Sequence, residues 1–218
     1  MFAAKRRNVA ILLFDDVEVL DFAGPFEVFA VTDELRGYET FNVFTAAESV
    51  GTIRAHNGLK IVPNYVIESC PSPHVLIVPG GFGTRALLGK PALLEWLRLR
   101  AAKSELTMSV CTGALVLAKA GLLDGLCATT HHECFALLRE IAPRTEVIET
   151  DRFVDNGRIL TAAGISAGID CALHAVERLL GAAAAANTAR YMEYRRMDQR
   201  SEAGGQKSGV RSQTSEEP

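Results

Sequence analysis

The sequence has no cysteine pairs of the kind that build a disulfide framework or a zinc site. Its five cysteines are an odd number, they are widely spaced, and none belongs to a Cys-x-x-Cys pair. Unpaired cysteines of this kind suit a reducing compartment. We therefore expect a cytoplasmic protein that binds no metal through its cysteines.

Long apolar runs and an excess of positive charge are also missing. The first apolar run covers residues 9–14 and ends at Asp15-Asp16, so it is shorter than the roughly 7–15-residue apolar core of a signal peptide. No run approaches the ~18 apolar residues that cross a bilayer. The formal net charge of −3 gives no electrostatic reason for binding to nucleic acid or to an anionic membrane. A soluble protein with neither partner is expected.

A linker is missing as well, because no stretch rich in proline, glycine and serine interrupts residues 8–200. Hydrophobic residues make up 48% and charged residues 22% of the 218 residues, which is ordinary for a globular protein. We expect residues 1–200 to form a single domain. Residues 201–218 contain almost no apolar side chains, so the sequence predicts a disordered polar tail there.

Strand-like and helix-like segments alternate along the chain, as judged from the spacing of apolar residues. The predicted strands cover residues 9–14, 40–46, 59–63, 74–78, 106–110 and 126–130, and an Asn-Gly pair predicts a hairpin over 153–161. The predicted helices cover residues 22–31, 91–103, the stretch after Cys111, 133–141, 167–180 and 182–196. This order predicts an α/β fold, a three-layer α/β/α sandwich with a mostly parallel central sheet. Ligands bind such sheets at the carboxyl ends of the strands.

Cys111 stands at the junction between a predicted strand and a predicted helix. An apolar run over residues 106–110 leads into it, and small residues including Gly113 follow. This pattern is typical of a nucleophile elbow, a sharp turn that exposes the side chain at the edge of the sheet. A helix N-terminus at the sulfur favours the thiolate, so we expect a nucleophile with a pKa below the usual ~8.5. The alternative is a buried structural cysteine.

Five short motifs resemble those of the ThiJ/PfpI superfamily, a branch of the class I glutamine-amidotransferase-like, flavodoxin-like fold. In chain order they are Leu20-Asp21-Phe22-Ala23-Gly24-Pro25, Val78-Pro79-Gly80-Gly81, Ser109-Val110-Cys111-Thr112-Gly113, Ala128-Thr129-Thr130-His131 and the stretch 160–170. Within the superfamily, the first and third motifs are most similar to isonitrile hydratases. The sensor domains of some AraC-type regulators share much of the same pattern.

The resemblance implies a site in which Cys111 is the nucleophile, Asp21 the acid beside it, and Thr112 a neighbour that orients water or holds a proton. Peptidase-like and glyoxalase-like members carry His directly after the cysteine, where this chain has Thr112, so those activities are disfavoured. A thiolate and a carboxylic acid together can add sulfur and a proton to an isonitrile carbon. Water would then release an N-substituted formamide, without a cofactor. Family members are usually homodimers, which implies a homodimer here.

Further candidates surround this centre. Backbone N–H groups around Gly81 and Thr112 could stabilise negative charge, and Gly80, Gly81, His131 and Ile165 are the candidate oxyanion or substrate-binding residues. Each role has a structural alternative: Asp21 could cap a helix, the two glycines could form a tight turn only, and His131 could be a structural hydrogen-bonding residue. A metal at His131-His132 is disfavoured, because adjacent residues seldom face one ion.

Two other functions stay open at this point. Cys111 could be an oxidisable thiol in a non-catalytic sensor of small molecules or oxidants. It could also serve an amidase or hydrolase of unrecognised substrate. The polar stretch after Arg200 is too short for a helix-turn-helix module, so we expect no nucleic-acid partner.

Overall fold

The computed structural model describes residues 6–196, and its centre is a seven-stranded sheet. The strand order is β10-β11-β7-β6-β1-β2-β5. These strands are β1 (Arg7–Leu12), β2 (Phe41–Ala47), β5 (Tyr65–Val66), β6 (Val75–Val78), β7 (Leu106–Val110), β10 (Phe153–Asp155) and β11 (Ile159–Ala162). The edge strand β10 pairs antiparallel with β11, and the other neighbours in the sheet pair in parallel. The predicted α/β fold with a mostly parallel sheet is confirmed.

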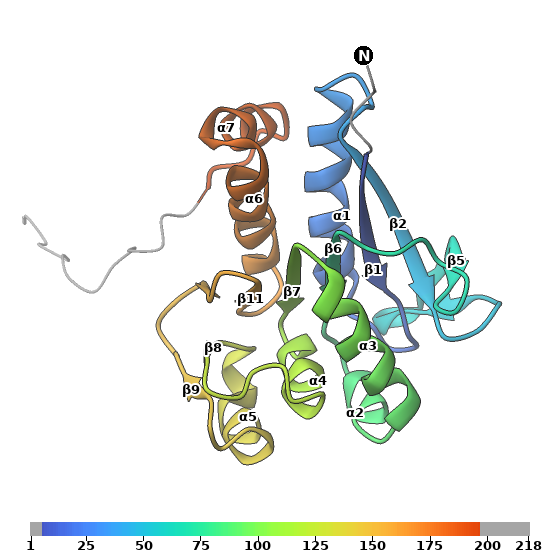
Figure 1. Cartoon of the computed structure of the whole chain (residues 1–218), viewed down its shortest axis with the longest axis vertical. Helices are drawn as coiled ribbons and strands as arrows, with labels where there is room; N and C mark the ends of the chain where they lie inside the picture. The colour runs from blue at the N-terminus through green and yellow to red at the C-terminus, as the bar shows by residue number, and fades with distance from the viewer. Residues whose placement is uncertain (1–5, 197–218) are drawn as a thin grey trace, which may run out of the picture.

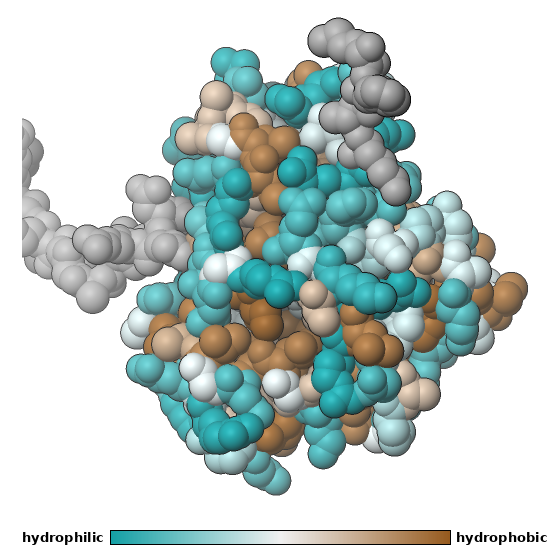
Figure 2. All heavy atoms as spheres, viewed as in Figure 1, coloured by the Kyte–Doolittle hydropathy of each residue, from teal (hydrophilic) through white to brown (hydrophobic). Residues whose placement is uncertain are grey.

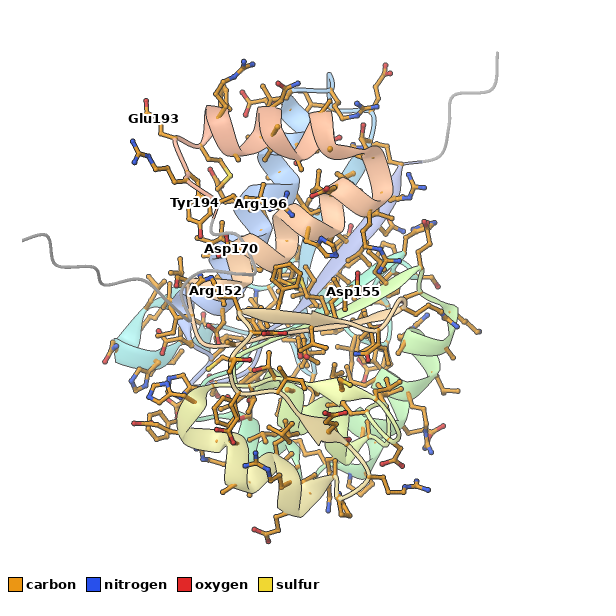
Figure 3. The ribbon with its side chains drawn as sticks, turned by 90° about the vertical axis from the view of Figure 1, so that its left-hand side faces the viewer. Arg152, Asp155, Asp170, Glu193, Tyr194 and Arg196 are labelled. Atoms are coloured by element: carbon orange, nitrogen blue, oxygen red, sulfur yellow. The ribbon has the colours of Figure 1, made fainter. Side chains whose placement is uncertain are left out.

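Helices cover both faces of this sheet (Figures 1 and 3). One layer contains α1 (Val19–Glu34), α6 (Ala167–Leu180) and α7 (Ala182–Tyr191), which pack against one another. The other contains α2 (Thr84–Leu87), α3 (Pro91–Lys103), α4 (Gly113–Lys119) and α5 (Phe135–Ile141). Because both faces are covered, the central strands are apolar on both sides, and every residue of β6 and β7 is buried.

Two small strand pairs lie outside the main sheet. β3 (Ile53–Arg54) and β4 (Lys60–Ile61) form an antiparallel pair around the short 3₁₀ turn η1 (His56–Gly58). β8 (Cys127–Ala128) pairs in parallel with β9 (Glu146–Val147), and the 3₁₀ turn η2 (His132–Cys134) follows β8. The sequence did not predict β5, β9 or α2, because segments this short carry no periodic pattern.

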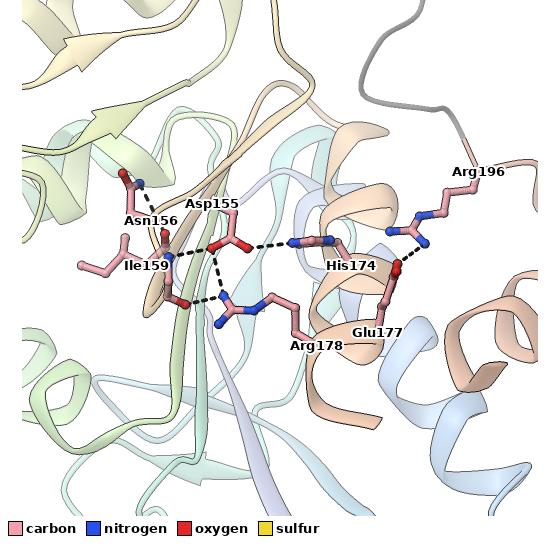
Figure 4. Close-up of polar contacts among 8 residues, drawn as sticks. Asp155, Asn156, Ile159, His174, Glu177, Arg178 and Arg196 are labelled. Atoms are coloured by element: carbon pink, nitrogen blue, oxygen red, sulfur yellow. Dashed lines mark hydrogen bonds and ion pairs between the residues drawn. The ribbon is translucent and has the colours of Figure 1, made fainter. Parts of the chain in front are cut away.

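The C-terminal helix ends earlier than predicted. α7 stops at Tyr191 rather than at residue 196, because Glu193 has a left-handed backbone (φ 51°) and reverses the chain. The Tyr194 N–H then donates to the Ala189 carbonyl at 2.9 Å, and Arg196 pairs with Glu177 of α6 (Figure 4). The predicted disordered tail over 201–218 lies outside the described residues.

Ion pairs tie the β10–β11 hairpin to α6. Asp170 of α6 is fully buried and pairs with Arg152, just before β10, at 2.7 Å (Figure 3). In the hairpin, Asp155 accepts hydrogen bonds from His174 at 2.8 Å and from Arg178 at 2.9 Å (Figure 4). A buried carboxylate is tolerated only when it is paired, so these contacts fix the hairpin against the helix layer.

Some hydrophobic side chains reach the surface, and Figure 2 shows them gathered over the region between β8, α4 and α3. A mostly apolar cleft is lined by Leu122, Leu126 and Ile159, and no cysteine, histidine or carboxylate lines it. Within residues 6–196, no helix is long and apolar enough to cross a membrane. The groups capable of catalysis gather elsewhere, at the carboxyl end of the sheet.

Candidate active site

The candidate site lies where the loops after four neighbouring parallel strands meet. β1, β6, β7 and β11 are adjacent and parallel in the sheet, so their carboxyl ends share one edge. The loop after β1 is held against the loop after β6, because the Glu18 N–H donates to the Gly80 carbonyl at 2.9 Å. A cleft of about 180 Å³ opens at this edge, with Cys111, Thr112, His131 and Ile165 among its lining residues.

Cys111 occupies the predicted strand–nucleophile–helix turn. It follows β7, precedes α4 by two residues, and has a left-handed backbone with φ 55°. Such a conformation costs a non-glycine residue about 1–3 kcal/mol and persists only when its surroundings impose it. Here the Cys111 N–H donates to the carbonyls of Ala162 (3.0 Å) and Ala163 (2.9 Å), and its own carbonyl accepts from the Thr130 hydroxyl at 2.8 Å. Two segments distant in sequence therefore hold the elbow.

The expectation of a low thiol pKa is wrong. Burial, and secondly the charge of Asp21, raise the pKa of the Cys111 thiol to about 12, although the Thr112 and Ile165 N–H groups act in the opposite direction. The Thr112 N–H, just before α4, does favour the thiolate, but removal of the sulfur from water outweighs it. Cys111 is 6% exposed, so the thiol keeps its proton until another group takes it.

Asp21 lies beside this thiol and is fully buried. Burial raises its pKa from 3.8 to about 7, against hydrogen bonds from Gly80 and Cys111 that lower it, and Glu18 adds a further upward shift. Oδ2 accepts the Gly80 N–H at 3.0 Å, while Oδ1 makes no hydrogen bond of normal geometry with residues 6–196. Asp21 does not cap a helix, because α1 begins at Val19 with Glu18 before it. The capping alternative is therefore wrong.

The two positions after β6 require glycine because other groups pack closely against the backbone there, and not only because the chain turns. A Cβ at Gly80 would lie 2.7 Å from Asp21 Oδ2 and 2.6 Å from the Thr112 nitrogen, so only glycine lets these groups meet. Gly81 has φ 124°, and its N–H donates to Thr112 Oγ1 at 2.9 Å. Because the N–H groups of both glycines are engaged, neither is a free oxyanion donor. The expectation that the Gly80 and Gly81 N–H groups form an oxyanion hole is therefore corrected.

The hydroxyl of Thr112 is likewise used within the protein. It lies 3.1 Å from the Gly81 carbonyl, which it reaches as a donor, and it accepts the Gly81 N–H. Thr84 Oγ1, which is fully buried, lies 2.8 Å from the same carbonyl and 3.2 Å from Thr112 Oγ1. Thr112 therefore holds the Gly81 turn in place and has no proton left over to give to a ligand in this arrangement.

The backbone donors that face the thiol come instead from Thr112 and Ile165. Both N–H groups lower the pKa of Cys111, and that of Ile165 also lowers the pKa of Asp21. Ile165 has φ 47°, a genuine outlier for a β-branched residue. Its strained backbone aims the N–H at the two groups that can carry negative charge.

His131 is half-buried and lines the cleft on the side of η2. It precedes η2, where its Nδ1 accepts the Glu133 N–H at 3.4 Å. The adjacent His132 is exposed and is not among the lining residues. The structure thus brings together all seven sequence-predicted site residues, although their catalytic and binding roles stay predictions.

Sequence reasoning missed several residues of the cleft wall. Phe82 is 63% exposed, and its ring lies between the His56 ring (5.3 Å between centroids) and the Arg85 guanidinium (5.2 Å). Glu18 and Cys134 also line the cleft. Only the position of Phe82, directly after the glycine pair, could have indicated it. Within residues 6–196 no group of three His, Cys, Asp or Glu side chains is placed to hold a metal ion.

Comparison with known proteins identifies the family. The DJ-1/PfpI family model matches residues 7–178. An isonitrile hydratase from Pseudomonas putida is 35% identical over 187 residues, which cover 86% of this chain and 78% of that protein. The transcriptional regulator GbdR from Pseudomonas aeruginosa is 29% identical over 172 residues, and the chain spans only 46% of its length.

Solved structures agree with this match. A ThiJ/PfpI family protein from Pseudomonas syringae has a TM-score of 0.79 and 28% identity, covering 93% of this chain and 81% of that one. DJ-1beta from Drosophila melanogaster, at 19% identity, shares the fold with a TM-score of 0.77 over 87% of this chain and 99% of its own. The chain belongs to the DJ-1/PfpI family.

Proposed function

We propose that this protein hydrates a small isonitrile to an N-substituted formamide, with Cys111 as the nucleophile. The observation that carries the proposal is the Asp21 carboxyl, buried beside Cys111 with its pKa raised to about 7. The residue after the nucleophile is Thr112 rather than histidine, so the adjacent base of a Cys–His arrangement is missing. The similarity to the isonitrile hydratase of Pseudomonas putida supports the same reaction.

The pKa values of Asp21 and Cys111 determine which of the two groups holds their shared proton. Asp21 titrates near 7 and Cys111 near 12, so above neutral pH the pair holds one proton, and that proton is on sulfur. Interacting groups of this kind titrate as a unit. The working form is thus a thiol beside a carboxylate, and not the thiolate beside a carboxylic acid that the sequence suggested.

In the first step, Asp21 takes the thiol proton and the sulfur attacks the terminal carbon of the isonitrile. Asp21 then gives the same proton to that carbon, which forms a C–S and a C–H bond. The product is a neutral thioimidate on Cys111, and Asp21 is again a carboxylate. The Thr112 and Ile165 N–H groups lower the energy of the sulfur anion that forms on the way.

In the second step, Asp21 accepts a proton from a water molecule while the water oxygen attacks the thioimidate carbon. The C–S bond then breaks and the formamide leaves. Of the two water protons, one ends on the nitrogen of the product and the other on the sulfur of Cys111. Asp21 returns to the carboxylate form, so the site is ready for another turnover.

The test is the appearance of formamide when the purified protein is incubated with cyclohexyl isocyanide, followed by mass spectrometry. We expect steady turnover that Cys111→Ala abolishes. Cys127→Ala is the matched control, because Cys127 is half-exposed and does not line the cleft. An absence of product from several alkyl isonitriles, or turnover that survives in Cys111→Ala, contradicts the proposal. Methylglyoxal in a parallel assay measures the glyoxalase route, which we expect to be silent.

A second candidate function is a sensor of small molecules or oxidants. The match to about half of the regulator GbdR favours it. A sensor predicts that Cys111 binds or is oxidised without turnover. A protein that is silent with isonitriles, and whose Cys111 is oxidised stoichiometrically by peroxide, would support this candidate instead.

A further inference from the structure

His131 is anchored beside the elbow by the two residues before it. The Thr130 hydroxyl donates to the Cys111 carbonyl at 2.8 Å. The Thr129 N–H donates to the hydroxyl of Thr161, in β11, at 3.0 Å. Both threonines are fully buried. The position of His131 is therefore set by the same segments that set the position of Cys111.

The orientation of the His131 ring is fixed from both edges. On one edge, Nδ1 accepts the Glu133 N–H at 3.4 Å and lies 3.9 Å from the Glu133 carboxylate. In the tautomer that accepts this hydrogen bond, Nε2 carries the ring proton. The opposite edge lies against Gly164, where an added Cβ would be 2.6 Å from Cδ2 and 3.4 Å from Nε2. Nε2 has no hydrogen-bond partner within the described part of the chain. His131 lines the same cleft as Cys111, so this nitrogen is left to contact a ligand bound there.

We propose that Nε2–H of His131 donates a hydrogen bond to the nitrogen of the thioimidate, an inference that rests on the proposed function. The nitrogen of an isonitrile uses all of its electron pairs in bonding and accepts no hydrogen bond. It gains a lone pair only when sulfur and hydrogen add to the carbon. The hydrogen bond therefore forms with the intermediate and not with the substrate, which is the condition for lowering a barrier.

The contact also makes the second step easier. A donor at the nitrogen withdraws electron density from the C=N bond, so the carbon becomes a better target for water. His131 donates a hydrogen bond and transfers no proton, because both protons that reach the products come from water. His131 is thereby a catalytic residue that acts mainly on the hydrolysis of the thioimidate and much less on its formation.

The experiment follows the two steps separately by rapid quenching and intact-mass measurement with cyclohexyl isocyanide. His131→Phe keeps a flat ring against Gly164 and removes the donor. We expect its thioimidate to form at nearly the wild-type rate and to hydrolyse on the order of 10²-fold more slowly, so that the adduct accumulates on Cys111. His131→Gln can place an amide N–H at a similar distance and should recover part of the hydrolysis rate.

His132→Phe is the matched control, because His132 is exposed and does not line the cleft; it should leave both rates unchanged. Hydrolysis at the wild-type rate in His131→Phe overturns the inference, and so does an equal loss in Phe and Gln, which indicates packing alone. A wild-type protein that forms neither adduct nor formamide overturns the proposed function itself, and is distinguished by that first measurement.

Discussion

Asp21 holds the backbone N–H of Gly80 at 3.0 Å with Oδ2, and its second oxygen makes no hydrogen bond of normal geometry with residues 6–196. A fully buried carboxyl with an unpartnered oxygen is costly when ionised. Asp21 is kept in this state next to the thiol, so its ionisation should lower the stability of the folded protein.

Asp21→Asn should lose activity and gain stability. Asparagine cannot move a proton, so turnover should fall by on the order of 10²-fold or more. The folded-state pKa of Asp21 is raised to about 7, so the folded wild type binds an extra proton between about pH 4 and 7 and loses stability as pH rises through that window. When the pH is raised from 5 to 8, the free energy of unfolding of the Asn variant should therefore increase by on the order of 1–3 kcal/mol relative to that of the wild type. Urea unfolding at both pH values measures this, and an active Asn variant with no such gain contradicts it.

The same variant should make Cys111 easier to alkylate. The charge of Asp21 helps to raise the pKa of the thiol to about 12, so removing that charge should lower the pKa and raise the thiolate fraction. In the wild type, Cys111 should react with iodoacetamide more slowly than the half-exposed Cys127. Peptide mass spectrometry against pH gives both rates. An unchanged Cys111 rate in Asp21→Asn would show that the two groups are not coupled.

Wild-type kcat/KM for an isonitrile should rise as pH increases through about 7, the pKa of Asp21, and then stay level. The carboxylate is the form that takes the thiol proton, and the pair keeps its single proton over the alkaline range below about 12. Initial rates across buffers of constant ionic strength measure the profile. A rate that falls through pH 7 would identify the protonated Asp21 as the working form.

Thr112→Val should destabilise the fold by about 1 kcal/mol, because it leaves the partly buried Gly81 N–H without its acceptor. It should also lower turnover, since the Gly81 turn lies against Asp21 and Cys111. Thr112→Ser keeps the hydroxyl and should remain near wild type in both measurements. Thermal unfolding and formamide production decide this, and a fully active Val variant removes any role for the hydroxyl.

Asp155→Asn should weaken the contact between the β10–β11 hairpin and α6 (Figure 4). Burial by itself would raise the pKa of Asp155, but hydrogen bonds from His174 and Gly157 and the charge of Arg178 lower it below 3.8. A lowered pKa contributes stability above the ordinary value and loses it as pH falls. Because Asp155 is largely exposed and water screens its contacts, the variant should cost no more than about 1 kcal/mol near pH 7, a difference that shrinks below about pH 4. Equal losses at both pH values would point to packing alone.

The sequence predicted the fold well where apolar periodicity is long. The predicted bounds of α3 and α6, residues 91–103 and 167–180, coincide with the structure. The start of α1 was placed at residue 22 instead of Val19, because Asp21 looks like a capping residue when it is read locally. Short elements such as β5 and α2 were not predicted, because contacts with residues distant in sequence stabilise them.

The sequence predicted which residues form the site, but not their pKa values or their hydrogen bonds. Motif resemblance placed Cys111, Asp21 and Thr112 together, and the structure places them together. The thiol pKa could not be read from the sequence, because it depends on burial and on a carboxylate from another loop. Nor does any local pattern show that the Gly81 N–H is already occupied by the Thr112 hydroxyl.

Thr130 and the carbonyls of Ala162 and Ala163 hold the elbow by hydrogen bonds to Cys111. All of these partners are synthesised after Cys111. Asp21 leaves the ribosome long before these partners do, and its carboxyl then titrates in water as an ordinary acid. Contacts between segments far apart in sequence form late in folding, and burial is the main cause of both shifts, so the shifted pKa values belong to the folded chain alone. The proposed nucleophile therefore acquires its surroundings only in a chain that has completed its sheet.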